Sequence, residues 1–322
     1  MNQRSNVSPP SFLGIGPPKT ATSWLYNALS HHPGVGMPPN KEIGYLWAKR
    51  FLPRSRYGDR FFSGHWYYAT RRRYMRNALR KHLLSLRNRR FNRRNFVWDL
   101  RFGLLPHTDT WYEHLFDQRK VSGDITPKYS ELAAPDIRAI RDRFGATKIV
   151  ITARDPVERE WSRAKMNLCR NRGVRQPHEV LEREWITHFD EPEQAEVNDY
   201  VALYERWAQV FGEEQVLLLY YDEISRAGWT AFLRVCNFLD LPPLPTSYQA
   251  RILVRVNAGI RVEIPPRYDQ YLFEKHRSKI VRLTERFPQH PYPHEWLSRH
   301  EHPLGATTVL TQAERAIPTG ER

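Results

Sequence analysis

Short apolar runs alternate with longer stretches of helical periodicity along most of the chain. The runs at residues 12–15, 149–152 and 216–221 are typical of buried strands. In four other stretches apolar residues recur every three or four positions. This spacing predicts helices at residues 23–29, 200–211, 229–239 and 268–287. This order predicts an α/β fold with a central parallel sheet flanked by helices, as one domain over residues 1–322 without an internal repeat.

The first strand ends in a turn that leads directly into the first helix. Gly16-Pro17-Pro18 excludes a helix at the turn. The N-terminus of a helix favours an anion, because its N–H groups point outward and it carries partial positive charge. Lys19 adds a full charge, and Thr20, Thr22 and Ser23 add hydroxyl groups. This strand–loop–helix segment is expected to bind a phosphate or a sulfate group, although an ordinary polar turn has a similar pattern.

The turn differs from the ATP-binding loop G-x-x-x-x-G-K-[ST] in one residue that matters. Pro18 stands where that loop needs glycine, and proline has neither the N–H nor the positive φ that glycine offers. The form Pro-Pro-Lys-Thr-x-Thr-Ser-Trp-Leu resembles instead the 5′-phosphosulfate loop of sulfotransferases that use 3′-phosphoadenosine-5′-phosphosulfate (PAPS). The resemblance implies a P-loop-like site for this donor, formed by Pro18, Lys19, Thr20, Ala21, Thr22, Ser23 and Trp24.

A Lys-Glu pair follows the first helix. Strand ends of neighbouring units meet at one edge of a parallel sheet, so Glu42 is expected near the group that Lys19 binds. A Lys–Glu pair on a solvated loop is the plainer alternative. Sulfotransferases of the heparan sulfate type carry Lys-Glu-x-His-Phe-Phe here, and the resemblance implies that Glu42 is the general base and that Lys41 lines the sulfate site. It also implies that Lys19 stabilises charge on the departing nucleotide. Gly44 replaces the family's His.

A second candidate anion site follows the strand at residues 149–152. Arg154 comes at the strand end, Asp155-Pro156 begin a helix, and Ser162 lies about two turns later. An arginine in this position suits a bidentate phosphate contact, and a structural Arg–Asp salt bridge is the alternative. Arg154 and Ser162 match the family's 3′-phosphate motif, Arg-Asp-Pro-x-x-x-x-x-Ser. Two such sites in this order suit one nucleotide with two anionic ends.

Two further groups of residues are weaker candidates. In relatives a later loop reaches over the nucleotide, which implies phosphate contacts from Arg255, Asn257 and Arg261. Cytosolic relatives that act on small molecules use a His shortly before the Arg-Asp-Pro motif. The nearest preceding histidines here, His107 and His114, lie at least forty residues upstream, so they rank below Glu42 as the base.

Residues 49–106 form a basic segment that the family resemblance does not cover. From Arg60 to Trp98 there are twelve Arg or Lys residues and no acidic residue. Apolar residues recur from Met75 to Leu86 at helical spacing, which predicts an amphipathic basic helix at about residues 74–87. Three functions suit this segment. It could be a lid that covers both the nucleotide and an anionic acceptor, a helix that contacts a membrane surface, or a surface that binds nucleic acid through stacking aromatic side chains. A merely solvated helix is the fourth interpretation, and no catalytic residue is expected there.

Composition narrows the remaining choices only a little. The net charge of +15 favours anionic partners without separating them, and Cys169 and Cys236 are too few for a disulfide framework. No apolar run has membrane-spanning length, so a cytoplasmic protein is expected, with a poorly ordered tail after His302.

The sequence thus predicts an enzyme that moves a sulfuryl group from PAPS to a hydroxyl or amine of an acceptor. By analogy the acceptor is a carbohydrate or glycolipid, and the family uses no metal ion. A kinase with a divergent loop and a non-enzymatic module that binds nucleic acid or anionic membrane are the rivals. Pro18 and the distant pair of Arg154 and Ser162 argue against both.

Overall fold

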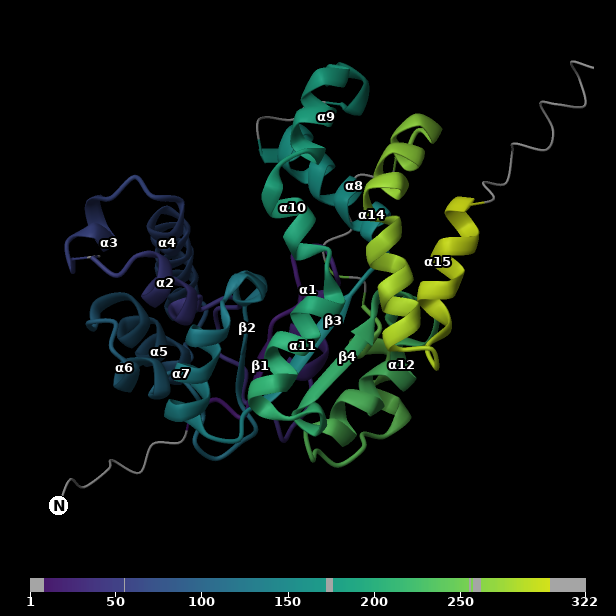
Figure 1. Ribbon diagram of the computed structural model, residues 1–322. Helices are drawn as coiled ribbons and strands as arrows, with labels where there is room; N and C mark the ends of the chain where they lie inside the picture. The colour runs from purple at the N-terminus through teal and green to yellow at the C-terminus, as the bar shows by residue number, and fades with distance from the viewer. Residues whose placement is uncertain (1–8, 55, 172–175, 255, 257–261, 302–322) are drawn as a thin grey trace, which may run out of the picture. The chain divides into compact units, whose positions relative to one another are not determined.

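The computed structural model describes residues 9–54, 56–171, 176–254, 256 and 262–301 (Figure 1). The chain divides into two compact units. The first contains Met1–Ala153 and Leu203–Asn257, and the second contains Arg154–Ala202 and Ala258–Arg322. The candidate contacts Arg255, Asn257 and Arg261 and the tail after His302 lie outside the described residues. That residues 1–322 form a single domain stays a prediction.

A four-stranded parallel sheet forms the centre of the first unit. Its strands are β1 (Phe12–Gly14), β2 (Gly123–Ile125), β3 (Lys148–Ala153) and β4 (Val216–Tyr220), in the order β2-β1-β3-β4. In the register of the sheet, Leu13 of β1 pairs with Asp124 on one side and with Ile149 on the other. The predicted α/β fold with a central parallel sheet is confirmed, and so are the strands expected from the three apolar runs.

The strand order sets where a ligand can bind. From β1 the chain continues to β2 on one side, and from β3 it continues to β4 on the other. The carboxyl ends of β1 and β3 are therefore a topological switch point, which is where open parallel sheets bind their ligands. The residues that follow these two strands include the two motifs predicted to bind anions.

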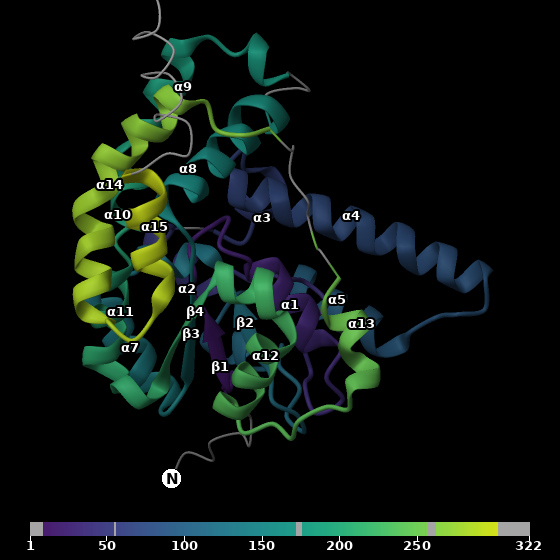
Figure 2. The ribbon, with the colours of Figure 1, turned by 90° about the vertical axis from the view of Figure 1, so that its right-hand side faces the viewer.

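Helices cover both faces of the sheet, as Figure 2 shows. On one side lie α1 (Thr22–Ser30), α12 (Tyr221–Phe238) and α13 (Gln249–Ile252), and on the other lie α7 (Ala134–Phe144) and α11 (Tyr200–Phe211). The core on the α1 side joins Phe12 and Val150 of the sheet to Leu25 and Phe232 of the helices. Each such buried side chain contributes about 1.5–3 kcal/mol of transfer free energy, so this core fixes α1 against the sheet.

The basic segment and the residues that flank it form further helices of the first unit. They are α2 (Tyr45–Phe51), α3 (Asp59–Phe62), α4 (Trp66–Arg87), α5 (Arg93–Leu104) and α6 (Asp109–Glu113). The predicted amphipathic helix is present as α4, but it begins eight residues earlier than expected. The ring of His65 caps it by accepting a hydrogen bond from the Tyr67 N–H. No helix of the described residues is long and apolar enough to cross a membrane.

The second unit consists of helices. They are α8 (Pro156–Lys165), a π-helical turn (Met166–Asn171), α9 (Glu182–Phe189), α10 (Pro192–Val197), α14 (Pro266–Arg286) and α15 (Pro291–Glu301). Short 3₁₀ turns complete both units at Pro127–Glu131, Pro177–Glu179, Glu213–Gln215 and Thr246–Tyr248. In the second unit the carboxylate of Glu160 is fully buried, and it pairs with His276 and accepts a hydrogen bond from Asn198. This network ties α8 to α14 and to the residue after α10.

Candidate active site

The loop after β1 is bound tightly to the end of β3. A Cβ atom on Gly16 would lie 1.9 Å from Thr152 Oγ1, so only glycine fits between the two segments. The hydroxyl of Thr20 donates to the Pro17 carbonyl at 2.7 Å and shares a 2.6 Å hydrogen bond with Thr152 Oγ1. Thr20 is fully buried. Its hydroxyl therefore holds the loop together in this structure, and its predicted ligand contact stays a prediction.

The loop then turns sharply into α1. Lys19 and Ala21 both have a φ of 78°, the left-handed conformation that glycine usually adopts. Ala21 is the N-cap residue and has no side-chain oxygen with which to cap the helix. The first turn of α1 therefore presents its N–H groups and its partial positive charge at the switch point, beside the ammonium-bearing Lys19. A backbone turn of this kind fits an anionic group.

Thr22 and Trp24, which follow in the motif, lie in different surroundings. Thr22 accepts a 3.2 Å hydrogen bond from the ammonium of Lys41. Trp24 packs in the hydrophobic core beside Phe232 rather than on the surface. The structure thus brings Thr22 together with Lys41, as the resemblance predicts, and gives the indole of Trp24 a packing role.

Lys41 connects this loop to the candidate base. Its ammonium lies 2.7 Å from Glu42 Oε1 in addition to its contact with Thr22. The side chain of Lys41 is only 17% exposed, whereas that of Glu42 is 53% exposed. Glu42 therefore points a carboxylate toward solvent beside a fixed positive charge, where an acceptor molecule can reach it.

The backbone around Glu42 is held in an uncommon conformation. Glu42 has a φ of 66°, and Gly44 has a φ of 67° at the start of α2. A left-handed non-glycine residue costs on the order of 1 kcal/mol or more and persists only where its surroundings fix it. The left-handed conformation at Gly44 favours glycine. At that position a side chain would be strained.

Three hydrogen bonds fix this segment. The Ile43 N–H donates to Asp124 Oδ1 at 3.3 Å, and the Gly44 N–H donates to Thr126 Oγ1 at 3.2 Å. From the other side, Arg71 of α4 donates to the Ile43 carbonyl at 2.7 Å. Sequence reasoning missed Asp124 and Arg71. Arg71 comes from the basic segment, in which no catalytic residue was expected.

Asp124 is the centre of a buried network below the Lys41–Glu42 segment. Its carboxylate is almost completely buried and accepts hydrogen bonds from Tyr129 at 2.5 Å, Tyr112 at 3.0 Å and Thr126 at 2.8 Å. Burial raises the pKa of Asp124 above its ordinary value, and the hydrogen bonds from these hydroxyl groups oppose that rise. Asp124 acts on the site only through the backbone that it holds, so it is a positioning residue.

The two histidine candidates for the base differ in their surroundings. The ring of His107 stacks on Trp111 and lies 2.9 Å from a guanidinium nitrogen of Arg71. Burial and then the positive charges of Arg71 and Arg60 lower the pKa of His107 to about 2, so its ring is a weak base. His114 is exposed and contacts the Thr110 carbonyl. The low pKa of His107 agrees with ranking it below Glu42, whereas exposure does not separate His114 from Glu42.

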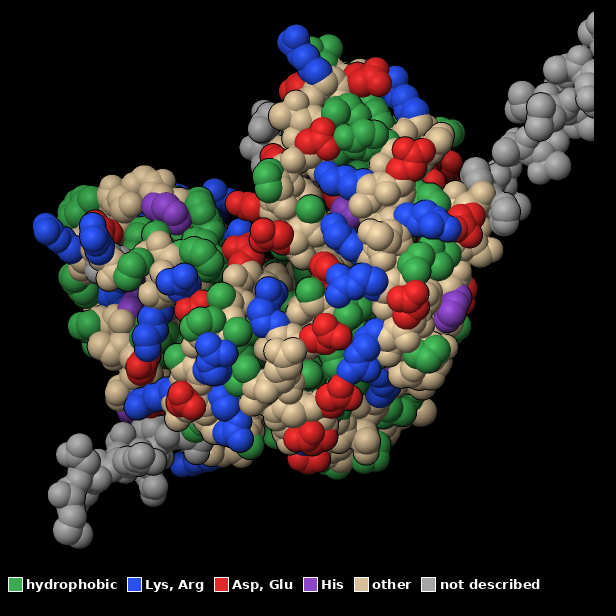
Figure 3. Space-filling model, in the orientation of Figure 1, with side chains coloured by type: hydrophobic (Ala, Val, Ile, Leu, Met, Phe, Trp, Pro, Cys, Tyr) green, Lys and Arg blue, Asp and Glu red, His purple; other side chains and the backbone are tan. Residues whose placement is uncertain are grey.

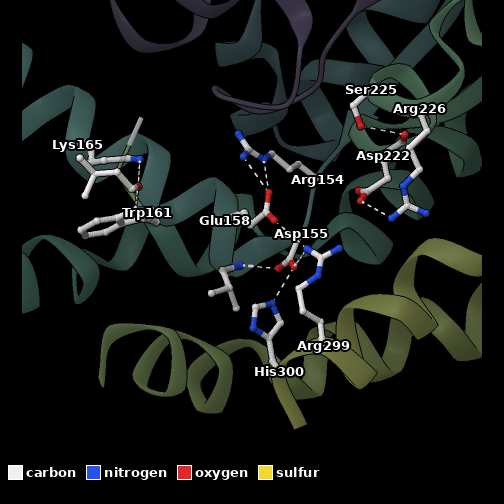
Figure 4. A network of polar contacts seen from close by, with 12 residues as sticks. Arg154, Asp155, Glu158, Trp161, Lys165, Asp222, Ser225, Arg226, Arg299 and His300 are labelled. Atoms are coloured by element: carbon white, nitrogen blue, oxygen red, sulfur yellow. Dashed lines mark hydrogen bonds and ion pairs between the residues drawn. The ribbon is translucent and has the colours of Figure 1, made fainter. Parts of the chain in front are cut away.

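The second motif begins the second unit, directly after the last residue of β3. Arg154 pairs with Glu158 of α8 at 2.9 Å (Figure 4). Ser162 follows Glu158 by four residues, one turn of the same helix. Asp155 caps α8 by accepting a hydrogen bond from the Val157 N–H at 3.0 Å. Arg154 therefore forms an ion pair with Glu158, whereas Asp155 caps α8. Arg154 precedes α8 and Ser162 lies within it, and a phosphate contact shared by the two stays a prediction.

A buried histidine stabilises the capping aspartate. His300 of α15 lies between Asp155 and Asp269, 2.8 Å from an oxygen of each (Figure 4 shows Asp155 and His300). Arg299 also reaches Asp155, at 3.2 Å. Although burial lowers the pKa of His300, the two carboxylates outweigh it and raise this pKa to about 9. His300 is therefore charged at neutral pH and fixes the start of α8, the helix that carries Ser162.

Comparisons with known proteins show the family of the chain. A model of the Sulfotransferase family matches residues 10–245, well over half of the chain. The chain therefore belongs to the Sulfotransferase family. A search of curated proteins finds no match.

Solved sulfotransferase structures share the fold. A sulfotransferase from Alicyclobacillus acidocaldarius is 22% identical, with a TM-score of 0.55 over 87% of this chain and 96% of that one. The sulfotransferase domain of the Synechococcus PCC 7002 olefin synthase is 17% identical, with a TM-score of 0.48 over 89% of this chain and 97% of that one. At such identities only the fold is shown, and the second similarity carries no argument. The family and the fold together support an enzyme that transfers sulfate.

Proposed function

We propose that this protein transfers a sulfuryl group from PAPS to a hydroxyl or amine group of an acceptor, with a carbohydrate or a glycolipid as the acceptor class. The observation that carries the proposal is the contact of Lys41 with both Thr22 and Glu42. Through it, the loop proposed to bind the donor and the carboxylate proposed to deprotonate the acceptor are neighbours in one compact unit.

The loop after β1 would hold the 5′-phosphosulfate end of the donor. The left-handed turn at Lys19 and Ala21 and the start of α1 present backbone N–H groups to an anion. When bound, PAPS supplies the sulfuryl group that is transferred. Lys19 would neutralise the negative charge that grows on the leaving nucleotide, and Lys41 would add a second positive charge beside Thr22.

Glu42 would act as the general base. Its exposed carboxylate would accept the proton of the acceptor hydroxyl as the hydroxyl oxygen attacks. The ion pair with Lys41 orients this carboxylate. The segment is fixed by Asp124 and Arg71, so the base is positioned before the acceptor binds.

Arg154 and Ser162 would hold the 3′-phosphate of the same nucleotide, with Asn257 and Arg261 as further contacts. A guanidinium makes strong charge-assisted hydrogen bonds to phosphate, and Ser162 supplies a hydroxyl on the same helix face. The phosphate would have to compete with Glu158 for Arg154, which makes this contact sensitive to the loss of either partner.

A thermal-shift titration tests the donor. The product 3′-phosphoadenosine-5′-phosphate (PAP) should raise the melting temperature, because a ligand that prefers the folded state stabilises it. ADP and magnesium-ATP, which lack the 3′-phosphate, should raise it less than PAP does, and Lys19→Ala should reduce the shift caused by PAP. Stabilisation by magnesium-ATP but not by PAP would contradict the proposal and favour a kinase.

A further inference from the structure

Most of the net positive charge and most of the exposed large hydrophobic side chains lie in the basic segment. Residues 51–105 contain fifteen Lys or Arg against two acidic residues, which accounts for +13 of the net charge of +15. Among the described residues, seventeen large hydrophobic side chains are exposed, and thirteen of them lie between Phe51 and Leu105. Figure 3 shows hydrophobic and basic side chains together over this part of the first unit.

Helix α4 separates these properties into stripes. Leu79, Leu83 and Leu86 recur at intervals of four and three residues and form one leucine stripe, in which each side chain is more than half exposed. Arg76, Arg80 and Arg87 form an arginine stripe beside it, and all three are exposed.

The inner face of α4 has a partner, which makes the outer face a separate surface. Tyr74 donates a 2.5 Å hydrogen bond to Asp99 of α5, and His82 pairs with the same carboxylate at 2.6 Å. Ala78 is buried on this side. The leucine stripe lies outside this contact. Figure 2 shows the end of α4 extending away from the strands.

We propose that the leucine and arginine stripes of α4 form a docking surface for a membrane that contains anionic lipids. Leucine side chains beside arginines suit the boundary between acyl chains and negatively charged headgroups. A nucleic acid would use the arginines but leaves the aliphatic stripe without a partner. A second copy of the chain, with its stripe against this one, would bring two arginine stripes together and repel. This surface does not depend on the proposed sulfuryl transfer.

Helix α4 carries this surface and also contacts the candidate site. Arg71, two turns before Leu79 on α4, donates to the carbonyl of Ile43 beside Glu42. The helix that docks therefore also holds the segment of the proposed base, so membrane docking would bring that segment near the lipid surface.

A fluorescent label on the full-length protein tests the proposal directly. Cys169 and Cys236 are buried, so Leu83→Cys offers the accessible thiol for an environment-sensitive dye. Vesicles of phosphatidylcholine with 30% phosphatidylglycerol should shift the emission to the blue. Pure phosphatidylcholine should do so weakly. The matched control is the label at Leu181→Cys, which is exposed in the second unit and should not shift.

Sedimentation with the same vesicles tests each stripe. Leu79→Ser with Leu83→Ser should weaken vesicle binding at least tenfold, while the matched pair Leu181→Ser with Val254→Ser changes it less than twofold. Arg76→Gln with Arg80→Gln should weaken it about fivefold for each arginine, unlike the exposed control pair Arg138→Gln with Arg251→Gln.

Three results would overturn the proposal. They are no binding to anionic vesicles, vesicle binding that the leucine substitutions leave intact, and a dimer that the leucine substitutions dissociate in the absence of lipid. Vesicle binding uses no donor or acceptor, so a failure here is distinct from a failure of the proposed reaction.

Discussion

Lys41 donates a 3.2 Å hydrogen bond to Thr22, which begins α1 directly after the loop that follows β1. The same ammonium lies 2.7 Å from Glu42. Lys41 thus contacts both the proposed donor loop and the proposed base. Because Glu42 is assigned to the acceptor, a substitution there tests catalysis separately from donor binding.

Glu42→Gln should lower turnover about 10²- to 10⁴-fold, the usual worth of a general base. The amide keeps the size of the side chain but cannot take a proton at neutral pH. Affinity for PAP should stay within a few-fold, since Glu42 is assigned to the acceptor. A steady-state assay of sulfate transfer and a PAP titration give the two values.

The matched control is Glu131→Gln, which removes another carboxylate paired with a lysine of the same unit, Lys128. It should leave turnover nearly unchanged. Turnover of Glu42→Gln within a few-fold of the parent, with the fold intact, would remove Glu42 from the role of base.

Asp124→Asn should lower turnover more than it lowers donor affinity. The amide presents N–H donors where the carboxylate accepts hydrogen bonds from Tyr129, Tyr112 and Thr126, so the segment above it loosens. The lost contacts should also cost about 1–3 kcal/mol of stability. The informative measurement is kcat beside the dissociation constant of PAP. An equal loss in both would mean that Asp124 supports the fold in general and not the position of Glu42.

Gly16→Ala should destabilise the protein by about 1–3 kcal/mol or more. The new Cβ would lie 1.9 Å from Thr152 Oγ1 and 2.6 Å from the Thr152 backbone nitrogen, and a backbone atom cannot rotate away. Gly64→Ala is the control, because nothing lies within 4 Å of a Cβ at that position. Denaturant melts of both variants measure the difference, and equal midpoints would contradict the close approach of the loop to β3.

His300 should make stability depend on pH. Its folded pKa of about 9 lies above the ordinary value of 6.5, so its contribution is fully present below about pH 6.5 and is lost as the pH rises through 9. The loss is on the order of 3 kcal/mol at most. Asp155, Asp269 and Arg299 are the charged groups that face it.

Melting temperatures at pH 6.5 and pH 9.5 check this dependence. His300→Gln should be less stable than the parent at the lower pH and close to it at the higher. A constant difference between the two proteins at both values would show that His300 does not carry the charge assigned to it.

Local patterns in the sequence predicted much of the fold. The apolar runs predicted β1, β3 and β4, and the Gly-Pro-Pro turn followed by Lys19 indicated the loop before α1. The start of α8 followed from Asp155-Pro156, because an aspartate before a proline is a typical helix start. α15 was not predicted, since Pro291 and Pro293 obscure the helical pattern at its start.

The contacts that position the site depend on residues far apart in the chain. Asp124 is a single acidic residue after a strand, and nothing local shows that it binds the Ile43 N–H, 81 residues away. Arg71 is one of twelve basic residues in its stretch. Thr20 carries a hydroxyl in a loop suited to an anion, yet the structure uses that hydroxyl to join the loop to Thr152. Such pairings arise from tertiary packing and have no signature in spacing.

The central claim is that two motifs, separated by more than a hundred residues, bind the two ends of one nucleotide. Calorimetric titrations of the parent, Lys19→Ala and Arg154→Ala with PAP and with AMP, which lacks the 3′-phosphate, test it most directly. Lys19→Ala should weaken both ligands. Arg154→Ala should weaken PAP about 10- to 100-fold, as expected for a charged hydrogen bond, and leave AMP unchanged. An Arg154→Ala protein that binds PAP as tightly as the parent does would contradict the account.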